Sequence, residues 1–390
     1  MARLGDYIKQ IRGVSYKPED LHSSLDDNSI ILLRANNIQD GKLVLDDVVF
    51  VDKSKVRAEQ LLKQGDILIC TSSGSKELVG KAAFVEADMN VTFGAFCKVV
   101  RPVMGHPRYL GHYFNSAVYR KQISALSAGA NINNIRNEHI DSLEIHMPSF
   151  DKQISRSDSL NKIDKLISLR KKQLQKLDDL VKSRFVEMFG DPIINQNNHE
   201  IKRISELFDV GSSKRVFESE WRDSGVPFYR AREIVKLSRD GYVDNELFIE
   251  ESMYEDYKKK YGVPKENDMM VTGVGTLGVC YIVKGTDKFY FKDGNILWFK
   301  NKGLCDVRFI KDQFETDYVK DQITANANVS TVGTYTITNA NNTMVLVPPI
   351  DDQHEYVAYC NNIDKLKAKI QQGLDKLEQM NQALMQKYFG

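Results

Sequence analysis

Residues 161–190 read NKIDKLISLRKKQLQKLDDLVKSRFVEMFG, and residues 361–390 read NNIDKLKAKIQQGLDKLEQMNQALMQKYFG. The two stretches lie 200 positions apart and are identical at 10 of 30 positions without a gap. A repeat of this length decides the architecture, because each copy must form the same kind of structural unit. A chain of 390 residues is long enough for two such units, each with its own hydrophobic core.

The repeat continues upstream at nearly the same offset. Four further pairs of segments correspond: RLGDYI (3–8) with RISELF (203–208), LLRANNI (32–38) with FYRAREI (228–234), KQGDILIC (63–70) with KENDMMVT (265–272), and LEIHMPSFDKQ (143–153) with MVLVPPIDDQ (344–353). The chain therefore consists of two copies of one repeat unit, and each copy is a globular part followed by a charged helical part. The predicted globular parts are residues 1–150 and 191–350, and the predicted helical parts are residues 151–190 and 351–390.

Both helical parts carry the heptad spacing of paired helices, with seven of nine seam positions apolar in each. The apolar seam residues include Ile163, Ile167, Leu174, Leu177 and Val181 in the first copy, and Ile363, Ile370, Leu374, Leu377 and Leu384 in the second. The polar seam residues fall at different places, namely Arg170 and Arg184 in one copy and Lys367 and Asn381 in the other. This difference favours pairing between the copies over self-pairing.

Connectivity favours an antiparallel pair. The first helix must carry the chain from one globular part to the next, and an antiparallel second helix returns, so that Gly390 ends near Met1. About 30 helical residues span about 45 Å, more than one turn of B-DNA at about 34 Å. The pair could therefore be a plain structural spacer or a spacer that separates two binding sites.

The globular parts are predicted to mix helices and strands. Short β-rich runs include GDILICT, KAAFVE, AFCKVVRP and SLEIHMP in the first copy, and NDMMVT, VCYIVKG, ILWFK and TMVLVPP in the second. HPRYLGHYFNSAVYRKQISALS and DVRFIKDQFETDYVKDQITAN have helical spacing. The predicted fold is thus two similar α+β domains and two long antiparallel coiled-coil helices, related by a pseudo-twofold axis.

Composition limits the class of protein. The chain is 42% hydrophobic and 27% charged, as in soluble globular proteins, and its 54 basic residues nearly balance 53 acidic ones. It has no run of 18 apolar residues and no signal-peptide pattern at its start, so we expect a cytoplasmic protein without a membrane segment. Five widely separated cysteines suggest buried small side chains rather than disulfides or a zinc site.

Catalytic motifs are missing from the sequence. GVGTLG (273–278), with Asp293 about 20 residues later, fits a dinucleotide-binding fingerprint, but a β-branched run follows it where that motif needs a helix. We therefore predict a glycine-rich turn between strands. Histidines show no metal spacing, no G-K-[ST] loop exists, and DPII (191–194) lacks the second proline and the aromatic of an adenine-methylating motif. The sequence predicts a binding protein rather than an enzyme, with no metal of its own.

Loops at corresponding places in the two copies suit DNA. Asparagine side chains match adenine, arginine matches guanine, and hydroxyls and lysine reach phosphates. The candidates in the first copy are Arg12, Tyr16, Lys17, Thr71, Ser72, Ser73, Ser75, Lys76, Asn131, Asn133, Asn134 and Arg136. Those in the second are Ser212, Ser213, Lys214, Arg215, Arg230, Arg232, Thr272, Thr276, Asn326, Asn328, Ser330, Thr331 and Tyr335.

Any one of these loops could be an ordinary solvated turn, since asparagine, serine and glycine gather in turns anyway. The loops nevertheless recur at matching positions while their sequences diverge. One repeated scaffold with two sets of loops suggests two different DNA targets.

With these features the chain resembles the specificity subunits of type I restriction-modification enzymes. The resemblance covers nearly all residues and rests on GDILI (65–69), GVPFYRAREI (225–234), PPIDDQ (348–353) followed by IDKL, and the order of the four parts. The family usually has Glu-Gln after the proline, whereas this chain has Lys152-Gln153 and Asp352-Gln353.

The resemblance implies a non-catalytic subunit that recognises a bipartite, asymmetric site in double-stranded DNA with a gap set by the helices. It also implies two adenine-N6 methyltransferase subunits, which use S-adenosylmethionine, and two restriction subunits, which use ATP and magnesium. Two alternatives stay open from the residues: a recognition subunit of another restriction class, such as type IIB, and a coiled-coil scaffold that does not bind DNA.

Overall fold

The computed structural model describes residues 1–75, 77–128, 134–244, 246–327 and 333–390, with only the backbone described at residues 127, 128, 326 and 327. The chain forms two compact units. The first unit comprises Met1–Gln173 and Ile370–Gly390, and the second comprises Leu174–Lys369. Each unit therefore contains one globular part and a stretch of both long helices.

The first unit is built on a four-stranded antiparallel sheet in the order β2 (Ile8–Arg12), β11 (Cys97–Pro102), β8 (Ile67–Cys70) and β9 (Ala82–Phe84). Because side chains alternate along a strand, β8 serves two cores. Ile67 and Ile69 pack with Tyr109 and Tyr113, whereas Leu68 and Cys70 pack in a separate cluster with Phe93. This strand is buried on both faces, as its unbroken apolar sequence predicts.

The remaining elements of the first unit flank this sheet. A second four-stranded sheet has the order β10 (Val91–Phe93), β4 (Ser29–Leu33), β7 (Val49–Asp52) and β3 (Leu21–His22), with β10 and β4 parallel. Two strand pairs are β1 (Ala2–Arg3) with β12 (Glu144–Ile145) and β5 (Ile38–Gln39) with β6 (Lys42–Leu43). The helices are α1 (Pro107–Phe114), α2 (Ala117–Ala128) and α3 (Asn137–Asp141).

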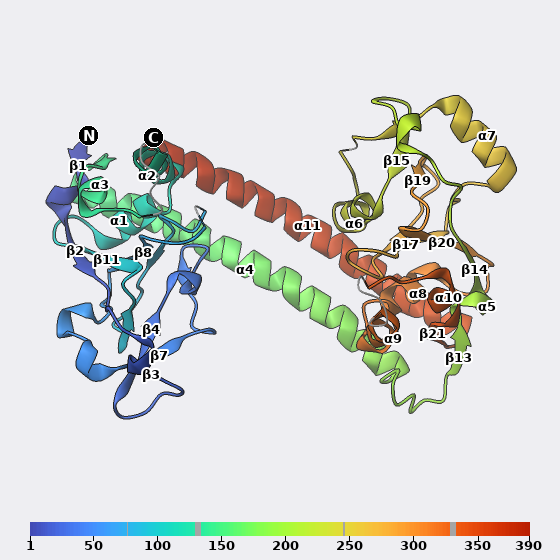
Figure 1. Ribbon diagram of the computed structural model, residues 1–390, viewed down its shortest axis with the longest axis horizontal. Coiled ribbons are helices and arrows are strands. Elements are labelled where there is room, and N and C mark those ends of the chain that lie inside the picture. The colour runs from blue at the N-terminus through green and yellow to red at the C-terminus, as the bar shows by residue number, and fades with distance from the viewer. Residues whose placement is uncertain (76, 129–133, 245, 328–332) are drawn as a thin grey trace. The chain divides into compact units, whose positions relative to one another are not determined.

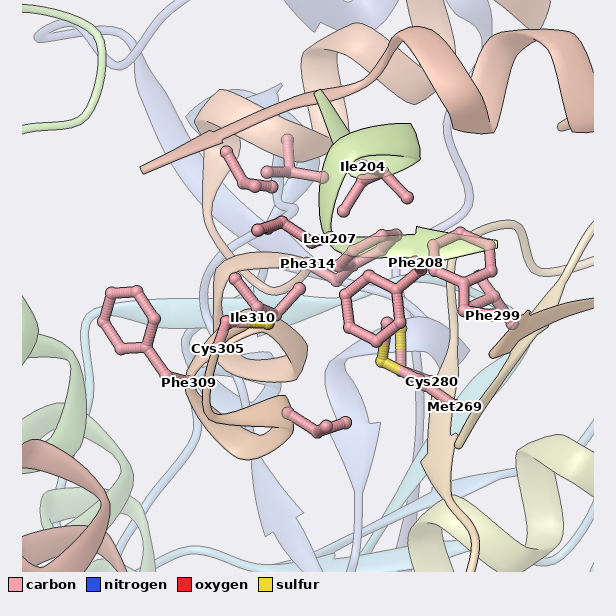
Figure 2. Close-up of a cluster of buried hydrophobic side chains, with 14 of the residues drawn as sticks. Ile204, Leu207, Phe208, Met269, Cys280, Phe299, Cys305, Phe309, Ile310 and Phe314 are labelled. Carbon is pink, nitrogen blue, oxygen red and sulfur yellow. The ribbon is translucent and has the colours of Figure 1, made fainter. Parts of the chain in front are cut away.

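The second unit repeats the plan. Its main antiparallel sheet has the order β14 (Phe208–Gly211), β20 (Ile296–Asn301), β17 (Met269–Thr272) and β18 (Cys280–Ile282). A second sheet has the order β16 (Phe248–Ile249), β15 (Val226–Tyr229) and β19 (Tyr290–Phe291), and β13 (Glu200–Arg203) pairs with β21 (Met344–Val347). Figure 2 shows Met269 and Cys280 from this main sheet packed with Phe208, Ile310 and Phe314 in the core.

The helices of the second unit are α5 (Ile204–Leu207), α6 (Ala231–Asp240), α7 (Glu251–Tyr261), α8 (Val307–Gln313), α9 (Asp317–Ala327) and α10 (Ile337–Asn342). The predicted strands and the predicted helical segments are confirmed in both units. The sequence did not predict α6 and α7. In the corresponding stretch of the first unit, the helical segments are the short 3-10 helices η3 (Ala35–Asn37), η4 (Lys53–Lys55) and η5 (Ala58–Gln60).

The two long helices are α4 (Phe150–Phe189) and α11 (Ile350–Phe389), each of 40 residues. In the first unit Asp164 contacts Asn381 and Lys171 pairs with Glu378, so the numbers rise along α4 as they fall along α11. The second unit shows the same reversal, with Asp178 bonded to Lys367 and Arg184 to Glu355. The helices are therefore antiparallel in each unit, as predicted (Figure 1). The ten predicted apolar seam residues are all buried or half-buried.

Both chain ends belong to the first unit, and they lie together (Figure 1). The Tyr109 hydroxyl is 2.9 Å from the His146 carbonyl oxygen and 3.4 Å from that of Tyr388, while Ala2 pairs with Ile145 in the adjoining strand. Phe389 packs on Tyr109 with ring centroids 4.9 Å apart, and its counterpart Phe189 packs on Phe309 in the second unit at 5.0 Å. The prediction that Gly390 ends near Met1 is confirmed.

Two smaller predictions are also confirmed. All five cysteines are free and buried. GVGTLG forms the connection between antiparallel strands β17 and β18, with positive φ at Gly275 and Gly278. Among the described residues, no helix is long and apolar enough to cross a membrane, and no group of three or more His, Cys, Asp or Glu side chains is placed to hold a metal ion.

Candidate nucleic-acid interface

At one end of the main sheet in the first unit, loops far apart in the sequence are joined by hydrogen bonds. The Thr71 backbone N–H and hydroxyl donate to the Phe96 carbonyl oxygen at 2.9 and 3.1 Å, and the Ser72 N–H donates to the same oxygen at 3.1 Å. The Thr71 carbonyl oxygen in turn accepts from the Ile135 N–H at 2.7 Å. Ser72 also forms an antiparallel bridge with Asn134.

The segment RGVSYK reaches the same end of the sheet. The Val14 N–H donates to the Phe93 carbonyl oxygen at 2.8 Å, and Val14 forms a bridge with Gly94. Gly13 passes so close that a Cβ atom there would lie 2.1 Å from the Gly94 carbonyl oxygen, so this position accepts only glycine. We call residues 12–17, 71–75, 94–96 and 134–136 together the first junction.

The second unit forms the same arrangement. The Gly273 N–H donates to the Asn295 carbonyl oxygen and the Tyr335 N–H donates to the Gly273 carbonyl oxygen, both at 2.9 Å. Ser212 accepts from the Gly294 N–H at 3.2 Å, and the Ser213 hydroxyl donates to the Phe291 carbonyl oxygen at 2.7 Å. We call residues 211–215, 272–276, 293–295 and 333–336 the second junction.

Matching main-chain bonds define which residues of the two junctions are equivalent. Thr71 corresponds to Gly273, Phe96 to Asn295 and Ile135 to Tyr335. The backbone framework is conserved between the copies, whereas the side chains that it presents differ. The structure thus brings the sequence-predicted loops together within each unit and places different chemical groups on one scaffold.

Several predicted residues of the first junction are available to a ligand. Arg12, Ser75, Asn134 and Arg136 are exposed. Within the described residues, neither Arg12 nor Arg136 pairs with a carboxylate. Lys17 lies 3.5 Å from Glu19, but both side chains are well exposed, so this ion pair holds the lysine only weakly. Exposed arginines that have no carboxylate partner among the described residues can bind phosphates or base edges.

Other predicted residues shape the junctions from inside. Thr71, Thr272 and Tyr335 are buried. The Thr272 hydroxyl donates to the Thr276 carbonyl oxygen and accepts from the Val279 N–H, and the Tyr335 hydroxyl bonds Thr343 at 2.7 Å. Burial raises the pKa of Tyr335.

Four more predicted residues complete the description of the junctions. Tyr16 packs half-buried against the small core around Val14. Ser72 and Ser73 are half-buried, and the Ser73 hydroxyl accepts from the Ser75 N–H at 3.2 Å. Thr276 is exposed at the tip of its loop. Ser73, Ser75 and Thr276 therefore remain on the surface of the junctions.

Cations in the second junction have protein partners. Arg215 pairs with Asp293 at 2.8 Å, and the Lys214 ammonium lies 5.8 Å from the centre of the Tyr261 ring. Arg215 is still 66% exposed, so water or a phosphate can reach its free edge. The two junctions therefore differ in charge. In the part of the chain that the structure describes, Arg12 and Arg136 of the first have no carboxylate partner, whereas Arg215 of the second pairs with Asp293.

Arg230 and Arg232 lie in an ion-pair cluster around the buried carboxylate of Glu233. Arg230 donates to it at 3.0 Å, and Arg232 bridges it to Glu246 at 2.7 Å. Burial alone would raise the pKa of Glu233, but hydrogen bonds from the two arginines outweigh it and lower that pKa. The structure gives both arginines an internal role at the start of α6.

One exposed residue of the first junction was missed by the sequence reasoning. Phe96 is 71% exposed in a turn directly before β11, whereas AFCKVVRP was interpreted as a strand throughout. The signal that could have revealed it is Gly94, a turn residue between two phenylalanines. Lys76, Asn131, Asn133, Asn328, Ser330 and Thr331 lie outside the described residues, as does the side chain of Asn326.

Comparisons with known proteins agree with this architecture. The model of the type I restriction modification DNA specificity domain matches residues 26–179 and 196–379. Specificity subunits of the type I restriction enzymes StySPI of Salmonella potsdam and EcoKI of Escherichia coli (strain K12) are 28% and 29% identical, each match covering 97% of this chain and 86% of the relative. The crystal structure of the type I restriction-modification system S subunit from M. genitalium has the same fold, with a TM-score of 0.59 at 14% identity over 100% of this chain and 95% of that one.

Proposed function

The chain belongs to the type I restriction modification DNA specificity family, and from this premise we propose that each junction reads one half of a bipartite, asymmetric site in double-stranded DNA. The chain itself catalyses no reaction in this proposal. The observation that carries the proposal is the repeated backbone framework with different side chains at its tips. Identical side chains would favour two identical half-sites, whereas these differ in charge, size and hydrogen-bonding groups.

The two long helices suit a role in setting the gap between the half-sites. Each is unbroken over 40 residues, and a helix of that length spans about 60 Å at about 1.5 Å per residue. In both units their pairing is held by buried apolar residues and by bonds between unlike polar residues. We propose that this pair sets the distance between the two half-sites.

Exposed apolar residues on the helices support docking of partner subunits. Phe150 and Ile350, Leu166 and Leu366, and Leu180 and Met380 are all exposed, and the members of each pair lie 200 positions apart. Apolar groups that recur at equivalent positions suit two copies of one partner.

We assign these positions to two adenine-N6 methyltransferase subunits, which use S-adenosylmethionine. Two restriction subunits, which use ATP and magnesium, complete the proposed assembly. The assembly acts on double-stranded DNA in the cytoplasm. The names of the relatives, which are subunits of restriction enzymes, support this assignment.

A domain exchange tests the proposed division of labour. Residues 1–150 are replaced by the equivalent part of a relative with a different target, and the sites methylated in cells are mapped by sequencing. We expect the first half-site to change while the second half-site and the gap stay the same. A change in both halves, or in neither, contradicts the proposal. The reciprocal exchange of residues 191–350 is the matched control.

A further inference from the structure

Phe96 and Asn295 occupy the same place in the two junctions. The Phe96 carbonyl oxygen accepts from the Thr71 N–H and that of Asn295 from the Gly273 N–H, in both cases at 2.9 Å. Each residue directly precedes the central strand of its main sheet, β11 or β20. The two positions and this main-chain bond are equivalent, whereas the side chains differ and the Phe96 carbonyl oxygen accepts two further bonds, from the Thr71 hydroxyl and the Ser72 N–H.

Among the described residues, the Phe96 side chain belongs to none of the hydrophobic clusters of the first unit. Its ring is 71% exposed, although the neighbouring apolar residues Phe93 and Cys97 are fully buried. The backbone beneath it is firmly held, because three donors from Thr71 and Ser72 bind its carbonyl oxygen and the Cys97 N–H closes the turn onto Gly94 at 2.8 Å. A rigid turn that presents a phenyl ring to solvent is ready to bind without losing much conformational freedom.

Asn295 is likewise available. It is half-buried, and within the described part of the chain its side-chain amide forms no hydrogen bond. Such an amide can bind a base edge without first breaking a hydrogen bond within the protein. Of the base edges, adenine offers in the major groove the donor and acceptor pair that matches an asparagine side chain.

From these contacts we propose that positions 96 and 295 are equivalent base-reading positions, at which Phe96 packs on the 5-methyl group of a thymine in the first half-site and Asn295 hydrogen-bonds an adenine in the second. Phenylalanine is one of the side chains that contact the thymine methyl group. This inference rests on the proposed function, because it assumes that each junction meets DNA.

The location of Phe96 among the other candidates supports a DNA partner. Its turn touches the segment of Arg12 through the Val14–Gly94 bridge and the segment of Asn134 through Ser72. An exposed apolar group whose turn is bonded to segments that carry arginine, hydroxyl and amide side chains resembles a base-reading surface more than a protein-docking patch, which would be apolar over a larger area.

The first test uses the assembled complex with its methyltransferase partners and a library of DNA duplexes that is randomised at both half-sites. Phe96→Asn is expected to change the preference at one base pair of the first half-site by roughly five- to a hundredfold and to leave the second half-site unchanged. Asn295→Phe is expected to act on the second half-site alone. Val103→Ala, at the far end of β11 and also exposed, is the matched control and should alter neither.

The second test identifies the contact. Each thymine of the first half-site is replaced by uracil, which lacks the methyl group, and binding of wild type and Phe96→Ala is compared. One replacement should weaken wild-type binding by roughly three- to fivefold and leave the variant unaffected. If Phe96→Ala weakens binding to the thymine and uracil duplexes equally, the ring acts as a wedge between bases and the methyl contact is overturned.

The outcomes separate this inference from the proposed function. If domain exchange changes one half-site but Phe96→Asn and Asn295→Phe change none, the junctions read DNA and the two assigned positions are wrong. If domain exchange itself fails, the proposed function is wrong as well. Thermal unfolding of each variant shows whether the unit stays folded, and the two substitutions serve as independent tests because they lie in different units.

Discussion

Asn381 on α11 donates its side-chain N–H to the carboxylate of Asp164 on α4 at 3.1 Å. The equivalent carboxylate in the second unit, Asp364, instead receives Arg308 at 2.8 Å, and the position equivalent to Asn381 is Val181. The carboxylates at these equivalent positions therefore have different polar partners in the two copies. A first half that paired with itself would place Val181 beside Asp164 and leave that carboxylate without its amide.

Replacing Asp164 by asparagine is expected to stabilise the protein at neutral pH. Burial raises the pKa of Asp164, so its ionised form is disfavoured in the folded state, and the cost appears as the pH rises above the unfolded value of 3.8. Asp164→Asn should thus raise the urea midpoint at pH 7, and the gain should vanish near pH 4. Asp364→Asn, which removes a charged partner of Arg308, is the matched variant and should lose about 1 kcal/mol at pH 7.

Replacing Glu233 by glutamine is expected to lower the free energy of unfolding by about 2 kcal/mol at pH 7, because two arginines lose a buried charged partner. The folded-state pKa of Glu233 is lowered, so its contribution is present above 4.5 and is lost as the pH falls further. The difference between wild type and variant in denaturant unfolding should shrink accordingly. Glu246→Gln, at an exposed partner of Arg232, should cost under about 0.5 kcal/mol. A pH-independent Glu233→Gln effect would argue that shape, and not charge, is at work.

Substitution of Arg136 tests whether this residue contacts a base or a phosphate. Arg136→Ala should weaken binding to the specific site by about 1 to 3 kcal/mol and affect random DNA much less, because a base contact exists only at the correct sequence. Fluorescence titrations over a range of salt concentrations measure both affinities and their salt slopes. Equal losses on both DNAs with a slope lowered by about 1 would make Arg136 a phosphate contact instead. Lys63→Ala, exposed before the opposite end of β8 from Thr71, is the control and should leave the specific affinity nearly unchanged.

Shortening both long helices tests whether they set the gap between the half-sites. Deleting residues 170–176 and 370–376 together removes seven residues from each helix and keeps the heptad frame. Seven residues correspond to about 10 Å, so the gap should shorten by about three base pairs. Methylation mapping in cells gives the gap directly. Deleting residues 170–176 alone leaves the two helices unequal in length and should lower the stability of the protein. An unchanged gap in the double deletion would show that the helices do not set the gap.

The repeat made much of this fold predictable from sequence. IDKL at 163–166 and 363–366 marks the two helices, and their seam residues predict the pairing that the structure shows. Helices α6 and α7 were not predicted, because only the start of α6 lies in a matched segment, FYRAREI (228–234), and the two copies diverge after it. The sequence of α6 nevertheless carries a helical signal, because Ile234 and Leu237 are spaced on one face and Gly241 ends the helix.

The candidate site was predictable only in part, because hydroxyl and amide residues look alike in a sequence whether buried or exposed. Thr71 and Tyr335 were selected for their polar groups, yet those groups bond to Phe96 and Thr343 inside the protein. Such partners are distant along the chain and become visible only when the chain is folded. Arg230 differs, because its partner Glu233 is only three residues away and caps the start of α6, a local pattern. Only the burial of Glu233 depends on the surrounding fold.

The bonds that define the two junctions are made almost entirely by main-chain atoms, from Thr71 to Phe96 and Ile135 and from Gly273 to Asn295 and Tyr335. A main-chain hydrogen bond does not depend on which side chain the same residue carries. Mutations at the exposed tips therefore carry little penalty in folding, and selection can act on them for the DNA that the proposed function has them recognise. In evolutionary terms, this separation lets a lineage acquire new targets by small steps while the protein that carries them stays folded.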